Sequence, residues 1–165
     1  MRYLAVIVLT VALAAFTPLA AYGLYTSGVS EGHGVITLRQ IDDIGWVAGG
    51  EYGIAGDWGV ALDIGEKDYN RGAVKLQLNP DLSLLLGVTG SKMFLGINPS
   101  VELTDNITGL SEFDIYYLDS KLALDYELGI RFGLTQKLDI RAGILGTATE
   151  SNTTNRFQLG LGYQF

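Results

Sequence analysis

Large apolar side chains alternate with small or polar ones along most of this sequence, and this alternation is the feature that most limits its fold. The clearest case is residues 157–165, FQLGLGYQF, where every odd position is apolar or aromatic and every even position is Gly or Gln. Successive side chains of a strand point to opposite faces, so this segment predicts a strand with one apolar face and one small, polar face. No segment after residue 21 keeps helical periodicity, and the sequence therefore predicts an all-β fold.

Ten segments with this alternation follow one another, separated by turn residues at intervals of about ten residues, as in an antiparallel meander. They are residues 34–41, 44–54, 58–65, 73–79, 82–89, 93–97, 113–118, 122–134, 138–147 and 157–165. The stretch 98–111 interrupts the series because Pro99 cannot donate a ladder hydrogen bond, and we expect residues 104–111 to form a loop. We predict ten strands, with eight as the alternative count.

Residues 1–21 have the pattern of a secretory signal peptide. Arg2 precedes an apolar run over residues 3–16, and small residues at Ala20 and Ala21 suit cleavage. The run is shorter than the roughly 20 apolar residues of a transmembrane helix, which is the alternative interpretation. We expect a signal helix whose removal leaves residues 22–165 as one barrel domain.

Composition narrows the function classes. The net charge is −7 at pH 7, and no basic patch is present to attract nucleic acid. The chain has no cysteine, so disulfides cannot stabilise it, and a fold that closes on itself is favoured. The 22 glycines have no triplet period and indicate strands that meet something closely on one face.

The two faces of the predicted strands differ in kind. One face is aliphatic and aromatic, whereas the other mixes many glycines with a few charges of both signs. A solvated outer face should be rich in Lys, Glu and Thr, so the polar face fits the crowded interior of a narrow barrel. The aliphatic face then meets lipid, where only a closed barrel pairs every backbone group of a sheet. The alternative is a secreted soluble β-barrel that binds a small apolar ligand in an aliphatic interior.

The predicted inward face contains acids and bases that can pair, because unpaired charges in a narrow interior are costly. The expected network in the lumen consists of Arg39, Glu51, Asp63, Lys75, Asp125, Glu127, Arg131, Asp139 and Arg141. Such a network either fills and closes the lumen or lines a small pore with a weak preference for cations. We favour a filled lumen, because side chains largely fill small barrels.

Candidate catalytic and metal-binding residues are sparse. His33 is the only histidine and precedes the first predicted strand, and no Cys/His metal spacing occurs. The acids at Asp42 and Asp43, and at Glu66 and Asp68, lack the spacing of a calcium loop. We therefore expect no enzymatic activity, no cofactor and no metal.

The apolar alternation that closes on Phe165 resembles the terminal strand of bacterial outer-membrane β-barrels. In architecture, residues 34–165 resemble the small barrels that include the OmpA transmembrane domain, OmpX and NspA. This resemblance implies an antiparallel up-and-down transmembrane barrel in the outer membrane of a Gram-negative envelope, structural or porin-like in role. It implies outer-membrane lipids and the barrel-assembly machinery as partners, and a monomer is favoured with the oligomeric state left open. The assembly signal that it implies is Phe157, Leu159, Leu161, Tyr163 and Phe165.

Overall fold

The computed structural model describes residues 30–118 and 121–165, so the expected signal peptide lies outside the described residues. The described residues form ten strands, which confirms the predicted count over the alternative of eight. These strands are β1 (Gly34–Ile41), β2 (Gly45–Ala55), β3 (Trp58–Gly65), β4 (Asn70–Asn79), β5 (Leu82–Thr89), β6 (Lys92–Thr104), β7 (Ile107–Leu118), β8 (Lys121–Gly133), β9 (Leu138–Ala148) and β10 (Thr153–Gln164). Within residues 30–118 and 121–165, no helix has the length and apolar character needed to cross a membrane.

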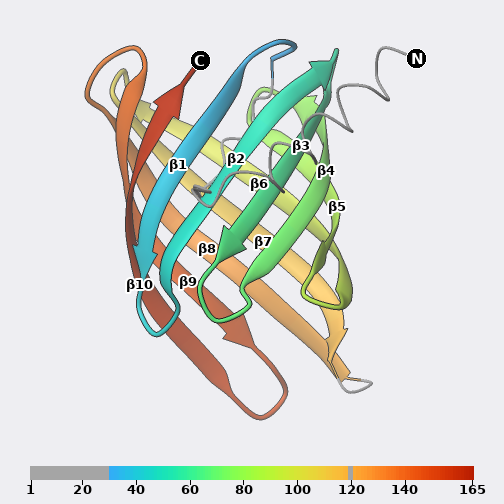
Figure 1. Ribbon diagram of the computed structural model, residues 1–165. Coiled ribbons are helices and arrows are strands. Elements are labelled where there is room, and N and C mark those ends of the chain that lie inside the picture. The colour runs from blue at the N-terminus through green and yellow to red at the C-terminus, as the bar shows by residue number, and fades with distance from the viewer. Residues whose placement is uncertain (1–29, 119–120) are drawn as a thin grey trace.

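Every strand pairs antiparallel with its neighbours along the chain, and β10 pairs with β1 to close the sheet into a barrel (Figure 1). The closing register runs from Val35 opposite Gln164 to Ile41 opposite Gln158. Beyond it, Gly34 and Phe165 exchange two backbone hydrogen bonds of 3.0 Å. Closure leaves no edge strand, and the last strand, β10, lies between β1 and β9.

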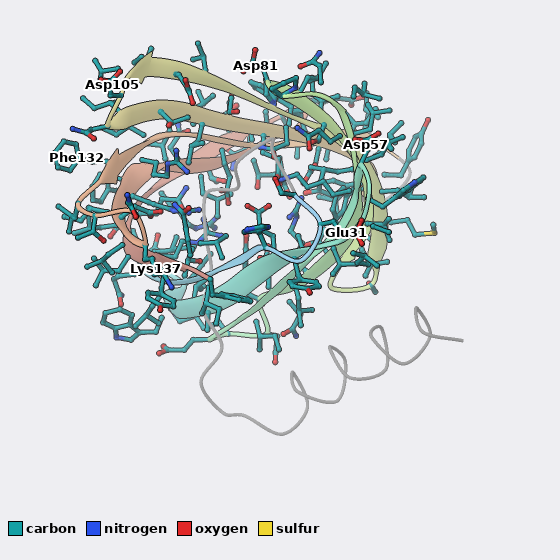
Figure 2. All side chains as sticks on the ribbon, turned by 90° about the horizontal axis from the view of Figure 1, so that it is seen from above. Glu31, Asp57, Asp81, Asp105, Phe132 and Lys137 are labelled. Carbon is teal, nitrogen blue, oxygen red and sulfur yellow. The ribbon has the colours of Figure 1, made fainter. Side chains whose placement is uncertain are left out.

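The two ends of the barrel are distinct. One end, here called the terminal end, carries Gly34, Phe165 and the turns that follow β2, β4, β6 and β8. Figure 2 looks onto this end, where Asp57, Asp81 and Lys137 mark three of those turns. The opposite, distal end carries the turns that follow β1, β3, β5, β7 and β9.

The expectation that residues 104–111 form a loop is wrong. β6 continues to Thr104 and β7 begins at Ile107, so the two strands form a hairpin. Thr104 Oγ1 accepts hydrogen bonds from the backbone N–H groups of Asn106 (3.4 Å) and Ile107 (3.1 Å), which holds this turn.

Pro99 lies inside β6 because neighbouring side chains replace its missing donor. The N–H of Ser100 donates to Asp81 O, in the turn just before β5, so the nitrogen of Pro99 faces β7 on the other side. There Asn98 Nδ2 donates to Ser111 O at 2.7 Å, and Ser111 Oγ donates to Pro99 O at 3.1 Å. Side-chain hydrogen bonds thus restore the contact between the strands that the proline removes.

Two further expectations are corrected near the distal end. The polar stretch 66–71 lies between the predicted strands 58–65 and 73–79, but β4 begins at Asn70, and Arg71 is a buried strand residue that faces the lumen. The predicted strand 44–54 includes Ile44, yet this residue lies in the turn before β2 and is only 8% exposed. It packs inside the barrel with Ile41, Val47 and Leu145.

The two faces of the sheet agree with the sequence pattern. Large apolar side chains such as Trp58, Leu86 and Leu161 are about half exposed on the outside, at 52%, 56% and 51%. Charged side chains such as Glu51, Asp63 and Lys75 are buried inside. This arrangement excludes the alternative of a soluble barrel with an aliphatic interior.

Candidate functional site in the lumen

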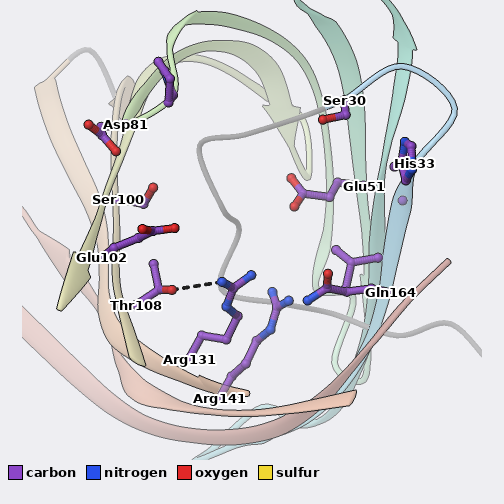
Figure 3. A pocket seen from close by; sticks show the side chains of 13 residues that line it. Ser30, His33, Glu51, Asp81, Ser100, Glu102, Thr108, Arg131, Arg141 and Gln164 are labelled. Atoms are coloured by element: carbon purple, nitrogen blue, oxygen red, sulfur yellow. Dashed lines mark hydrogen bonds between the residues drawn. The ribbon is translucent and has the colours of Figure 1, made fainter. Parts of the chain in front are cut away.

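The half of the lumen next to the terminal end, here called the terminal half, contains a cavity of about 450 Å³ (Figure 3). Its wall is formed by β1, β2 and β6 to β10, by the turn between β4 and β5, and by residues before β1. It is lined by Ser30, His33, Gly34, Val35, Glu51, Pro80, Asp81, Ser100, Glu102, Thr108, Arg131, Arg141 and Gln164.

The other half of the lumen, the distal half, is packed with side chains. The void found there measures about 20 Å³ and lies among Tyr69, Arg71 and Glu127. One apolar cluster of buried residues fills the lumen on the side of β3 to β8, and the cluster around Ile41 fills it near β1, β2 and β9. The first cluster consists of Ala61, Ala73, Leu85, Phe94, Tyr116 and Ala123.

Arg71 is the centre of the distal half. From β4 it reaches β7, where its guanidinium contacts Glu112 and lies 2.7 Å from Asp114 Oδ2. It also lies 3.4 Å from Asp63 Oδ2 on β3, and 4.4 Å above the ring of Phe94. Because β4 and β7 are not neighbours in the sheet, this arginine connects separate walls of the barrel across the lumen.

Arg39 makes a second connection across the lumen. From β1 its Nη1 lies 3.0 Å from Glu127 Oε1 on β8, and it also donates to the side chain of Gln158 on β10. Lys75 on β4 pairs with Glu51 on β2 at 2.8 Å. All of these side chains are at most 10% exposed, so solvent screens their attraction only weakly.

Acids on β7 and β8 lie directly opposite one another in the register. Glu112 faces Glu127, and Asp114 faces Asp125. Like charges in this position destabilise a sheet unless other groups compensate them. The two arginines supply that compensation for three of the four acids, and Asp125 instead accepts hydrogen bonds from Tyr116 (3.0 Å) and Thr147 (2.7 Å).

The two arginines of the cavity wall have their partners on their own strand or on the neighbouring strand. Arg141 binds both carboxylate oxygens of Asp139, two residues before it on β9, at 2.7 and 3.1 Å. Gln164 Nε2 donates to the same carboxylate at 3.3 Å. Arg131 donates to Thr108 Oγ1 at 2.9 Å on the neighbouring strand.

The structure brings together three pairs from the predicted set: Arg39 with Glu127, Lys75 with Glu51, and Arg141 with Asp139. In the described part of the chain, Asp125 and Arg131 form hydrogen bonds with hydroxyl groups and no ion pair. The prediction missed Arg71, Glu112 and Asp114. Glu112 and Asp114 alternate with the apolar Phe113 and Ile115 along β7. This alternation could have identified the two acids as inward-facing residues.

Polar groups outside the strands add little chemistry. Burial raises the pKa of the Tyr69 phenol, in the turn after β3, well above its ordinary value, so Tyr69 stays neutral. His33 is exposed, and its Nδ1 lies 3.1 Å from Glu31 O. Among the residues that the structure describes, no group of three or more Asp, Glu or His side chains is placed to hold a metal ion.

Comparison with known proteins places this geometry in a family. A sequence model described as "Outer membrane protein beta-barrel domain" matches residues 4–165. No curated protein matches the chain in sequence.

Solved structures with a similar fold include small outer-membrane barrels. Ail of Yersinia pestis, in a phospholipid bilayer nanodisc, has 14% identity and a TM-score of 0.48, over 82% of this chain and 100% of that chain. The KdgM porin, in complex with disordered oligogalacturonate, has 12% identity and a TM-score of 0.49, over 81% and 99%. Omp33 of Acinetobacter baumannii has 12% identity and a TM-score of 0.38, over 81% and 97%. Likeness at this level carries no argument about what the chain does.

Proposed function

The chain belongs to the family of outer-membrane protein β-barrel domains and resides in the bacterial outer membrane, and from this premise we propose that it is a non-enzymatic structural barrel whose distal half-lumen is closed to solutes. The observation that carries the proposal is the pair of arginine connections across the lumen, from Arg71 to Glu112 and Asp114 and from Arg39 to Glu127. They accompany a void of about 20 Å³, which is close to the volume that one water needs.

Closure follows from the cost of opening such a path. A hydrated ion needs a continuous column of water through the distal half, and that column must separate at least one buried ion pair. Removing one partner of a buried pair typically costs about 3–5 kcal/mol, so separation of these pairs is rare at equilibrium. The alternative within the same family is a narrow pore with a weak preference for cations, in which the acids of β7 and β8 line a conducting path.

Conductance in planar bilayers tests this proposal. We expect the wild-type barrel to show no steady openings. The double variant Arg39→Ala/Glu127→Ala removes both charges of one connection and should raise conductance. Its matched control is Lys121→Ala/Glu150→Ala, which removes an ion pair whose side chains are 64% and 62% exposed and should leave conductance unchanged. Steady wild-type openings as large as those of the first double variant would establish the narrow pore instead.

The proposal extends to assembly, with the terminal end facing the periplasm and a monomer as the folded unit. Alternate residues of β10, together with the terminal Phe165, form a continuous apolar stripe on the outside of the barrel, since each is about half exposed. They are Phe157 (52%), Leu159 (51%), Leu161 (51%), Tyr163 (47%) and Phe165 (48%). We propose that the barrel-assembly machinery reads this stripe.

The variant Phe165→Ala separates recognition from folding, because it keeps the backbone hydrogen bonds between residue 165 and Gly34. We expect slower insertion in the presence of the assembly machinery and unchanged spontaneous folding into detergent micelles. Met93→Ala is the control, since Met93 is a 70% exposed apolar residue on another strand. Equal insertion rates for the two variants would refute a role of the stripe as a signal.

A further inference from the structure

We propose that the cavity in the terminal half is a binding site for a small anion with a carboxylate or phosphate group, held by Arg131. Membership of the outer-membrane β-barrel family does not by itself assign a function to this cavity. The inference does not depend on whether the distal half conducts, because the cavity opens at the terminal end.

The guanidinium of Arg131 has N–H donors beyond the one that binds Thr108. It is half-buried on the inward face of β8, and its guanidinium points into the cavity (Figure 3). Within residues 30–118 and 121–165 its hydrogen bond is to the neutral hydroxyl of Thr108, and it has no carboxylate partner. A guanidinium offers five N–H donors in a planar fork that matches carboxylate and phosphate oxygens. Arg131 therefore presents a charge and unused donors to the cavity.

A second arginine increases the local positive charge. Arg131 and Arg141 lie directly opposite each other on β8 and β9. Asp139 offsets part of the charge of Arg141 and occupies the Nε and one terminal nitrogen of its guanidinium. Two like charges in opposed positions repel each other. An anion bound in the cavity beside both guanidinium groups relieves that repulsion.

The acids of the cavity wall compensate the charge of Arg131 only in part. Glu51 is paired with Lys75. Asp81 and Glu102 are exposed, so water screens their charge. Glu102 lies in the same row of the sheet as Arg131, with Thr108 of β7 between them, and forms no ion pair with it. It competes weakly with a bound anion, and its removal should strengthen binding.

The dimensions and remaining donors define the ligand class. A cavity of about 450 Å³ lies within the range of small-molecule sites. The hydroxyl groups of Ser100 and Thr108 lie in its wall near Glu102, on the side of β6 and β7. These features suit a compact polar molecule that carries one anionic group.

Titration of the detergent-folded protein with inorganic phosphate, and separately with acetate, tests the inference by calorimetry or NMR shifts. We expect saturable binding of at least one probe to the wild type. Arg131→Gln should weaken it roughly tenfold or more, as expected when a charge-assisted contact is lost. Lys137→Gln removes an exposed positive charge at the same end of the barrel and should change affinity less than twofold. Glu102→Gln should tighten binding.

Three results would overturn the site: no saturable binding by the wild type, equal affinity of Arg131→Gln, or equal weakening by Lys137→Gln. Heat-modifiable gel migration confirms that each variant is folded. Glu102→Gln leaves Arg131 in place, so unchanged or weaker binding by this variant also counts against the site. Conductance is measured separately, and failure of the closed-lumen proposal is thereby distinguished from failure of this one.

Discussion

The two halves of the lumen use the same kinds of residue and reach opposite results. In the distal half, Arg39 and Arg71 extend from one wall to acids on another, and the void among the side chains is about 20 Å³. In the terminal half, Arg141 pairs with Asp139 on its own strand, and a cavity of about 450 Å³ remains. The comparison teaches that the volume left in a narrow barrel depends on which walls its ion pairs connect and on the apolar side chains packed beside them, more than on how many charges point inward.

Two inward-facing glycines, one in each half, differ in the space around them. A Cβ on Gly87 in the distal half would lie 2.3 Å from Gly72 O and 2.5 Å from the ring of Phe94. A Cβ on Gly133 in the terminal half would have Asn106 O as its nearest neighbour, at 3.8 Å. Position 87 therefore needs glycine for space, whereas position 133 has room for a side chain.

The largest expected effect is that of Gly87→Leu. The added side chain meets a backbone carbonyl that cannot move without breaking the sheet, so we expect no folded barrel. Gly133→Leu is the matched control and should fold. Heat-modifiable gel migration after folding in detergent measures both. Folding of Gly87→Leu with normal migration would contradict the description of the distal half as fully packed.

The next effect concerns arginine itself. Arg71→Ala leaves Glu112 and Asp114 buried without their cation and should destabilise the barrel by about 3–5 kcal/mol. Arg131→Ala, on the cavity, should cost less than about 1.5 kcal/mol, the scale of one ordinary hydrogen bond. Urea unfolding in detergent micelles compares the two variants. Equal losses of stability would remove the energetic distinction between the halves.

Local pattern explains why much of the fold could be predicted. Three predicted strands, 34–41, 58–65 and 82–89, have the bounds of β1, β3 and β5, because clean alternation there runs between clear turn residues. The pattern failed where polar residues begin a strand, as at Asn70 and Arg71. It also failed at Pro99, since the compensating contact between Asn98 and Ser111 joins different strands.

The pairing inside the lumen could be predicted less well. Alternation identifies which charges point inward, but strand tilt and register decide which of them meet. Arg39 and Glu127 are 88 positions apart, and no local signal relates them. Inward apolar residues such as Leu85 and Phe94 were also missed, because apolar residues on both faces of a strand hide the period of two.

A smaller effect is expected at the border between the halves, where Asn98 lies one inward position beyond Ser100 of the cavity wall. Asn98→Ala removes the donor to Ser111 O and should cost about 1–3 kcal/mol, because a buried carbonyl loses its partner. Pro99→Ala in the same chain supplies a backbone N–H that points to β7 and should recover part of the loss. Urea unfolding of the single and double variants measures this recovery. Additive losses would show that Asn98 does not replace the missing donor of the proline.

The smallest effect is expected for an ion pair outside the lumen. Lys121 and Glu150 lie 2.9 Å apart at the distal end, with side chains 64% and 62% exposed. Exposed pairs contribute about 0–1 kcal/mol, because water already solvates both charges. A double-mutant cycle with Lys121→Gln and Glu150→Gln should therefore give a coupling energy under about 1 kcal/mol, far below that of Arg39 with Glu127. Similar coupling in the two cycles would mean that water screens the distal half as it does the surface, and the contrast between a packed and an open half-lumen would then have no electrostatic basis.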